Sequence, residues 1–255
     1  MIDSCYIGDH RIIMRPSFGG KLIVPSTDLS IMPDLILSGH IEPELCKWIQ
    51  NNVKPGNVCF DVGANIGFIT LLLGIQVGAS GKIYSFEANP NAYEILLDNI
   101  AMNGLNAEAH NQAIWSEESQ ILIYCSNRLL GGSSVKDHMA NYSDRVDTIV
   151  PALSFDTFCS EQAIDYIDFL KIDIEGAEYH AFLGMEHLLA DKRTGTIVFE
   201  FSRWALGEDL KPFQELLTAV PEARFYALGH NGEEIEIDIN RQFENGPNQN
   251  ILMRL

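Results

Sequence analysis

Short apolar runs alternate along most of the chain with segments whose apolar residues recur at the spacing of one helical face. The runs at 58–62, 82–87 and 167–174 are each followed by such a helical segment. The run at 167–174 is almost continuously apolar, which is typical of a strand buried on both faces of a sheet. This alternation predicts an α/β fold with an open, mostly parallel sheet and helices on both faces.

The helix predicted for residues 90–103 has the clearest ends. Asn89 is a favourable N-cap, Pro90 suits the first helical position, and Gly104 can end the helix. The other elements follow from the same periodicities: helices from Pro43 and over 68–77, 176–190 and 209–220, and strands at 107–114, 120–125, 146–153, 196–201, 223–228, 235–239 and 251–255.

The first forty residues precede this alternation. Apolar runs at 11–14 and 21–24 are joined by Pro16 and the pair Gly19-Gly20, which predicts a hairpin-like arm over residues 1–40. Residues 41–255 are then expected to form one domain. The arm could cover a cleft or contact a partner subunit, and the sequence is compatible with a homo-oligomer.

Charge and composition disfavour several classes of function. The chain has 17 Lys and Arg against 35 Asp and Glu, a net charge of −18, which argues against nucleic acids and anionic membrane surfaces as partners. The sequence lacks a long uninterrupted apolar run and begins without the order of a signal peptide, so we expect a soluble, cytoplasmic protein. Five scattered cysteines without a CxxC pair predict reduced thiols rather than a zinc site or disulfides.

Candidate chemistry lies where two predicted strands end, because ligands of such sheets bind beyond the carboxyl ends of the strands. The segment 61–67, DVGANIG, has glycines that permit a tight turn and close approach of the backbone to a ligand. Asp61 would repel a pyrophosphate but favour a sulfonium or amino group. Glu87 ends the second strand and can accept hydrogen bonds from both hydroxyls of a ribose. A nucleoside with a positively charged tail fits both carboxylates.

A third group of polar residues follows the long buried strand, in the segment 171–178, KIDIEGAE. Alternation along the strand places Lys171, Asp173 and Glu175 on one side. Two neighbouring carboxylates favour a cation, or raise the pKa of one carboxyl so that it can act as a base. Glu200 holds a parallel position at the end of the next strand.

Together these segments resemble the FkbM-type family of S-adenosylmethionine-dependent methyltransferases. The matching text is FDVGANIG at 60–67, FEANP at 86–90, IDFLKIDIEGAE at 167–178 and a closing VFE at 198–200. Two positions depart from familiar versions of the pattern. Ala88 stands where this family usually has Pro, and Asn65 replaces the central Gly of the wider methyltransferase turn, although Asn is itself usual in the family.

The resemblance implies a Rossmann-like class I methyltransferase fold with a C-terminal antiparallel hairpin, and S-adenosylmethionine as the cofactor. It also implies how the cofactor is held. The methionine part is surrounded by Asp61, Gly63, Asn65 and Gly67, the ribose is held by Glu87 with Ala88 beside it, the adenine side contacts Gln112 and Ala113, and Asp173 closes the pocket near the reactive methyl group.

Methyl transfer from a sulfonium is an in-line displacement that needs no metal in principle, so no metal site is expected. An alcohol acceptor must lose its proton as the new bond forms, and a base near the cleft is therefore expected. The candidates, in order, are Asp173, Glu175, Glu200 and His180, of which His180 also suits a surface or capping role. The loop 129–136 has glycine hinges and hydroxyl groups suited to a lid.

Families of this kind mostly methylate hydroxyl groups of sugars and secondary metabolites. The resemblance therefore implies O-methylation of a small-molecule or glycan acceptor, a carbohydrate or natural-product intermediate. Three alternatives stay open: an N-methyltransferase for a peptide or amide, an NAD-dependent Rossmann oxidoreductase, and an inactive cofactor-binding partner subunit. Asp61 and the missing G-x-G-x-x-G motif oppose the oxidoreductase.

Overall fold

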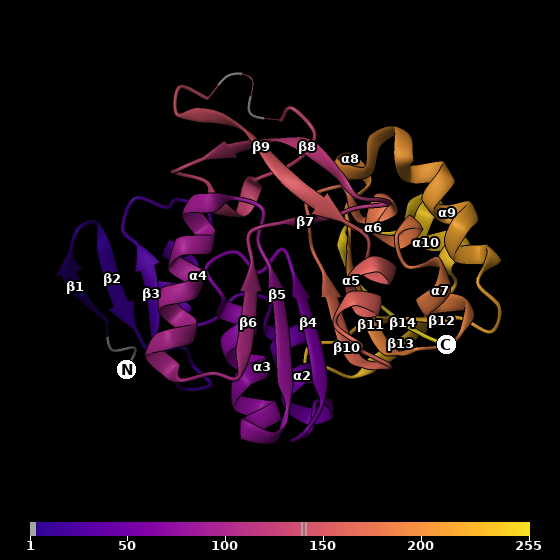
Figure 1. Cartoon of the computed structure of the whole chain (residues 1–255), viewed down its shortest axis with the longest axis horizontal. Coiled ribbons are helices and arrows are strands. Elements are labelled where there is room, and N and C mark those ends of the chain that lie inside the picture. Colours follow the sequence, from indigo (N-terminus) through magenta and orange to yellow (C-terminus); the bar gives the residue numbers. More distant parts are fainter. Residues whose placement is uncertain (1–3, 139, 141) are drawn as a thin grey trace.

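The computed structural model describes residues 4–138, 140 and 142–255 of the chain. Its centre is an eight-stranded sheet in the order β13-β12-β14-β11-β10-β4-β5-β6 (Figure 1). The strands are β4 (Val58–Val62), β5 (Lys82–Phe86), β6 (Ala107–His110), β10 (Ile167–Ile172), β11 (Thr194–Phe201), β12 (Arg224–Leu228), β13 (Glu234–Ile237) and β14 (Gln249–Arg254).

Five of these strands, from β6 to β11, are parallel, as the sequence predicts. The expected C-terminal antiparallel hairpin is formed by β12 and β13. The last strand, β14, lies between β11 and β12 and runs antiparallel to both. The chain moves outward from β4 to β6 and then returns to β10, so the strand order reverses between β4 and β10. Such a reversal opens a crevice at the carboxyl ends of the two strands.

Helices cover both faces of the sheet because alternate strand residues point to opposite faces. Phe60 and Phe199 pack into one apolar cluster, whereas their neighbours Cys59 and Val198 pack into the other. The first cluster includes residues of α5 (Phe155–Glu161), α6 (Glu178–Leu183), α7 (Glu186–Ala190), α9 (Leu210–Ala219) and α10 (Ile239–Asn245). The second includes residues of α1 (Met32–Ser38), α2 (Pro43–Asn52) and α3 (Phe68–Val77). The remaining helices are α4 (Pro90–Asn103) and α8 (Arg203–Leu206).

Two predicted elements are each divided in the structure. The helix expected over 176–190 is α6 followed by α7, because the Asp156 carboxylate accepts hydrogen bonds from the amides of His187 and Leu188 and so caps a new helix. The strand expected over 107–114 is β6 followed by β7 (Ala113–Ile114). Between them the Asn111 side chain bonds to the carbonyl oxygens of Glu87 and Ala88, which turns the chain out of the main sheet.

The strand β7 belongs to a second sheet with β9 (Arg145–Leu153) and β8 (Ser119–Ser126). Figure 1 shows this small sheet beyond the carboxyl ends of β4, β5 and β6. Ile121 and Ile123 of β8 face the space between the two sheets, where they line a cavity. The small sheet therefore forms a roof over the crevice.

The N-terminal region forms a three-stranded antiparallel sheet of β1 (Ser4–Gly8), β2 (Arg11–Met14) and β3 (Leu22–Pro25). The sequence predicted two of these strands, and it missed β1 and the helix α1. The buried side chain of Asn99 in α4 bonds to both the amide and the carbonyl of Ile23, at 2.6 and 3.0 Å. Met14 and Leu22 also join the apolar cluster of α2 and α3. This sheet therefore shares the core of the larger domain.

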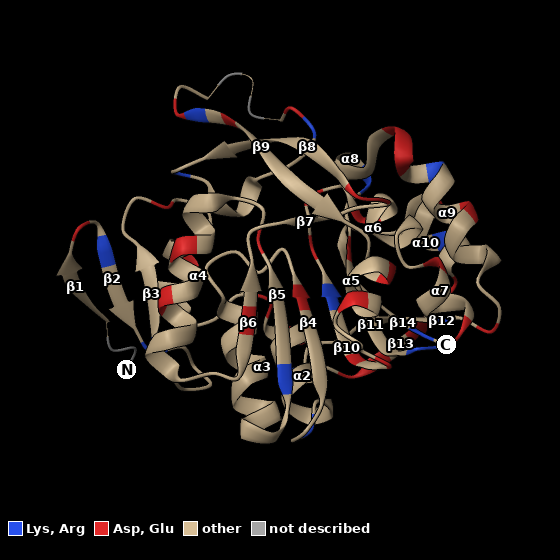
Figure 2. Cartoon of the chain, in the orientation of Figure 1, with Lys and Arg blue, Asp and Glu red and all other residues tan. Residues whose placement is uncertain are grey.

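The five cysteines are free: Cys5 is exposed, and Cys46, Cys59, Cys125 and Cys159 are buried. The acidic residues, which dominate the net charge, are spread over the strands, the loops and the helices (Figure 2). Within the described residues, every helix is too short or too polar to cross a membrane.

Candidate functional site

A cavity of about 330 Å³ lies at the carboxyl ends of β4, β5, β10 and β11, under the small sheet. Its walls come from the turn after β4, the end of β5, the segment 112–115, the loop 130–135, the segment after β10, and Glu200 of β11. Seven of the nine cofactor candidates line it: Gly63, Asn65, Glu87, Ala88, Gln112, Ala113 and Asp173.

The turn after β4 has a backbone shape that only certain residues adopt. Gly63 has φ +76°, and a Cβ atom there would lie 1.7 Å from the backbone oxygen of Asp173. A side chain at this position is therefore excluded. Asn65 has φ +50°, and its buried Oδ1 has no hydrogen-bond partner among the described residues. At Gly63 a ligand can approach the backbone closely, and at Asn65 the cavity wall offers a hydrogen-bond acceptor. Both features fit a polar ligand such as the methionine part of the cofactor.

Glu87 is held by the same turn. One carboxylate oxygen accepts a hydrogen bond from the amide of Asn65 and the other accepts one from the amide of Asn89, both at 2.7 Å. Burial raises the pKa of Glu87 to about 7, although both backbone hydrogen bonds lower it. The carboxylate is thus fixed in orientation at the cavity wall, where its remaining lone pairs can accept two hydroxyl groups.

Two expected cofactor contacts lie outside the cavity lining. Asp61 is fully buried beneath the turn, where its Oδ2 accepts a hydrogen bond from Thr70 at 2.6 Å and its Oδ1 lies 3.9 Å from Lys171 Nζ. Gly67 begins α3, and a Cβ atom there would lie 2.6 Å from a Leu96 side-chain carbon. The sequence placed both on the ligand, but in the structure they support the turn from below, and Lys171 is the cation that faces Asp61.

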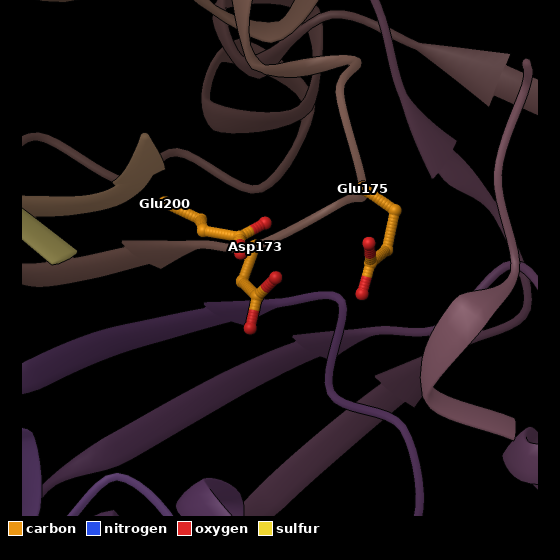
Figure 3. A group of neighbouring side chains, drawn as sticks. All are labelled: Asp173, Glu175 and Glu200. Atoms are coloured by element: carbon orange, nitrogen blue, oxygen red, sulfur yellow. The ribbon is translucent and has the colours of Figure 1, made fainter. Parts of the chain in front are cut away.

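Three carboxylates that line the cavity lie close together (Figure 3). Asp173 and Glu175 follow β10, Glu200 lies on β11, and one oxygen of each lies within 4.8 Å of the others. Asp173 Oδ2 forms an ion pair with Lys171 Nζ at 3.1 Å. Lys171 is therefore the cation of this cluster, as well as of Asp61.

The other two carboxyls have raised pKa values. Burial raises the pKa of Glu175 to about 8, and the neighbouring charge of Asp173 adds to the effect. Burial and the charges of Asp173 and Glu175 raise the pKa of Glu200 to about 9. Both groups therefore hold a proton at neutral pH, when they can donate hydrogen bonds. Oxygen ligands at this spacing could also hold a divalent cation such as Mg²⁺, which the sequence did not predict.

His180, the fourth candidate base, lies outside the cavity lining. Its ring stacks on Trp115 with centroids 3.9 Å apart, and its Nε2 lies 3.8 Å from Asp209 Oδ2. Burial lowers its pKa. Trp115 itself lines the cavity, so it stands between His180 and the space where an acceptor would bind. In the structure His180 therefore supports Trp115, and its role in proton transfer stays a prediction.

Sequence reasoning missed Glu42, which lines the cavity from the chain before α2. Its backbone has φ +46°, and its Oε1 accepts a hydrogen bond from Asn250 at 2.5 Å. A charged residue before a helix-starting proline looks like ordinary surface, so the sequence carries no signal for it. Asn65 and Glu175 also line the cavity with positive φ, and such backbone is often found at functional sites.

The loop 130–135, for which the sequence suggested a lid, lines the cavity, and hydrogen bonds hold it to several neighbouring segments. Ser134 Oγ donates to the carbonyl of Glu175 at 2.8 Å, and Asn89 donates to Ser133 Oγ at 3.0 Å. The amide of Leu130 donates to the buried Asp28 carboxylate at 3.0 Å. These hydrogen bonds connect the loop to the segment after β5, to the carboxylate cluster and to the N-terminal region.

Comparison with known proteins gives consistent matches. Residues 61–230 match the family model described as "Methyltransferase FkbM domain". The "2-O-methyltransferase NoeI" of Sinorhizobium fredii (strain NBRC 101917 / NGR234) is 27% identical over 197 residues, which cover 72% of this chain and 79% of that protein. The "Methyltransferase sdnD" of Sordaria araneosa is 26% identical, over 53% of this chain and 62% of that protein.

Among solved structures, the methyltransferase FkbM from Methylobacillus flagellatus KT matches with a TM-score of 0.47 and 15% identity. The match covers 78% of this chain and 44% of that one, so this chain spans less than half of that protein.

Proposed function

We propose that this chain, which belongs to the FkbM methyltransferase family, transfers the methyl group of S-adenosylmethionine to a hydroxyl group of a sugar or natural-product intermediate. The observation that carries the proposal is one cavity lined by two groups of residues. The first group is the turn after β4 with the fixed carboxylate of Glu87, and the second is the cluster of Asp173, Glu175 and Glu200.

The first group of residues fits the cofactor. The backbone at Gly63 suits the polar methionine part, as does Asn65 Oδ1, which lacks a hydrogen-bond partner among the described residues, and Glu87 suits the ribose. Gln112 and Ala113 line the wall beyond Glu87 and are suited to the adenine. When bound, S-adenosylmethionine supplies an electrophilic methyl group on a positively charged sulfur.

The second group of residues suits a hydroxyl acceptor. Asp173 would accept the proton that the hydroxyl loses as its oxygen bonds to the methyl carbon and the bond from that carbon to sulfur breaks. Lys171, 3.1 Å from Asp173, offsets the carboxylate charge and fixes its position. Glu175 and Glu200 hold protons near neutral pH and donate hydrogen bonds to acceptor oxygens. The name of NoeI, a 2-O-methyltransferase, supports oxygen rather than nitrogen as the acceptor atom.

The test combines cofactor binding with methyl transfer. Calorimetry should detect micromolar binding of S-adenosylmethionine and S-adenosylhomocysteine, and no comparable binding of NAD. Transfer of labelled methyl from S-adenosylmethionine to a panel of neutral sugars and glycosides then identifies the acceptor, and NMR of the product locates the new O-methyl group.

Asp173→Asn should lower kcat by about 10²–10⁴, because general-base catalysis contributes about that much. Glu175→Gln is the matched control, since Glu175 already holds a proton near neutral pH, and it should cost less than about tenfold at pH 7. Equal kcat losses in the two variants would remove Asp173 from the role of base. Binding of NAD without S-adenosylmethionine would overturn the assigned function.

A further inference from the structure

A second cavity, of about 550 Å³, opens beside the first. Its walls come from the start of α2, the turn between β12 and β13, and the start of β14. Glu42 belongs to the lining of both cavities. The two spaces therefore meet at the side chain of one residue.

The sheet register explains why the cavities are neighbours. Glu200 of β11 pairs with Asn250 of β14, so the strand position that points a carboxyl into the first cavity lies beside a residue that lines the second. The hydrogen bond from Asn250 to Glu42 then crosses from the sheet to the chain before α2. This pair lies where the two spaces meet.

The outer wall of the second cavity is fixed in place. Gly232, in the turn between β12 and β13, has φ +75°, and a Cβ atom there would lie 2.6 Å from the backbone nitrogen of Trp48 in α2. The indole of Trp48 donates to the Glu234 carboxylate at 2.8 Å, and Arg254 of β14 bonds to the same oxygen at 2.6 Å. The turn, α2 and β14 thus hold one another, and the hollow between them is part of the fold.

The lining combines hydrogen-bonding groups with apolar surface. Carboxylates of Glu42, Glu44 and Glu233 and the side-chain amides of Gln249 and Asn250 provide acceptors and donors. Leu45, Leu228 and Ile235 provide apolar contact, and the described lining contains neither Lys nor Arg. His230 also lines the cavity, and its Nδ1 lies 3.1 Å from Glu44 Oε1. Paired carboxylates and amides beside an apolar surface match a sugar ring, which has hydroxyls at its edge and C–H groups on its faces. The same carboxylates repel anions.

We propose that the second cavity binds a further sugar unit of the acceptor, so that the substrate is an oligosaccharide or glycoside of neutral or amino sugars. This proposal rests on the function proposed above. The hydroxyl to be methylated lies in the first cavity, and the chain of sugars passes Glu42 into the second. The carboxylates of Glu44 and Glu233 disfavour uronic acids and sugar phosphates.

Calorimetry with the full chain saturated with S-adenosylhomocysteine tests this proposal. The probes are trimers of glucosamine, N-acetylglucosamine and galacturonic acid, each beside its monosaccharide. The first two trimers should bind at least about tenfold more tightly than their monosaccharides, and the galacturonate trimer should show no such gain. Glu44→Gln and Glu233→Gln should each weaken trimer binding several-fold and leave monosaccharide binding unchanged. Glu215→Gln, an exposed carboxylate on α9, is the matched control and should change neither.

Each possible result supports or contradicts the proposed sugar site. Equal affinity for trimers and monosaccharides, or no detectable binding of any trimer, would overturn the proposed sugar site. Trimer binding that both variants leave unchanged would place the extra sugar elsewhere, and tighter binding of the galacturonate trimer would refute the charge argument. Trimer binding that weakens in the variants, without methyl transfer to any sugar, would support the second cavity and contradict the proposed function instead.

Discussion

Removal of the buried ammonium of Lys171 should destabilise the protein strongly. Lys171 is 4% exposed, and its Nζ lies 3.1 Å from Asp173 and 3.9 Å from Asp61. Burial lowers the pKa of Lys171, but the charges of Asp173, Asp61 and Glu42 together raise it above its ordinary value. A raised lysine pKa stabilises the fold at every pH below the ordinary value, so the contribution is complete at pH 7.

Lys171→Met would leave buried carboxylates without their cation, and breaking a buried ion pair in this way costs about 3–5 kcal/mol. Burial raises the pKa of Asp61 even beside Lys171, so Asp61 will take up a proton when the lysine is gone. Because protonation removes one unpaired charge, we expect the loss of unfolding free energy to lie near the lower limit, at about 3 kcal/mol. For a chain of this size each kcal/mol lowers Tm by about 2–4 °C, which gives a fall of roughly 6–12 °C.

Urea unfolding at pH 7 measures the loss, with Lys82→Met as the matched control. Lys82 lies at the same 3.1 Å from a carboxylate, that of Glu108, but the two side chains are 32% and 44% exposed. An exposed pair contributes at most about 1 kcal/mol. Asp61→Asn in the Lys171→Met background removes one unpaired carboxylate and should recover part of the loss. If Lys171→Met cost no more than Lys82→Met, the argument from the buried charge would be refuted.

Two further variants test the site. Because the pKa of Glu200 is raised, the folded state keeps a proton that the unfolded state loses above about pH 4.5. The free energy of unfolding should therefore fall as pH rises from about 4.5 towards 9, by up to about 1.4 kcal/mol per pH unit. Glu200→Gln should flatten this fall in a series of melts from pH 5 to 9, and an unchanged slope would contradict it. Gly63→Ala should destabilise the fold by about 2–5 kcal/mol and abolish S-adenosylhomocysteine binding, because the Asp173 backbone oxygen occupies the space for Cβ. Gly131→Ala in the same cavity meets its nearest atom at 3.4 Å and should be tolerated.

The central sheet and seven residues of the cavity wall could be predicted because their signals are local. Strand alternation, helix caps and the glycines at 63 and 67 are each visible within a few residues. The rule that ligands bind at the carboxyl ends of parallel strands then brings distant segments together, and it places Glu87 beside the turn after β4. The structure shows their contact as the hydrogen bond from the amide of Asn65 to Glu87.

The positions of Asp61 and His180 that the sequence did not predict depend on partners far away in the sequence. Contacts with Thr70 and Lys171 fix the direction of the Asp61 side chain. The sequence around Asp61 predicts neither contact. His180 is covered by Trp115, which reaches it through a segment that leaves the main sheet at Asn111. Periodicity predicts which face of an element a residue occupies, but it does not predict which other element covers that face.

The backbone also couples the turn after β4 to Asp173. Neither can therefore be altered without an effect on the other. Parallel pairing of β4 with β10 continues past the strand ends, because the amide of Asp173 donates to the carbonyl of Val62 at 3.0 Å. Gly63 then packs directly on the Asp173 carbonyl. A displacement of the turn that faces the cofactor therefore moves the residue assigned as the base. It follows that changes at Gly63 should alter cofactor affinity and turnover together, whereas Asp173→Asn, which leaves the backbone in place, should lower turnover far more than affinity.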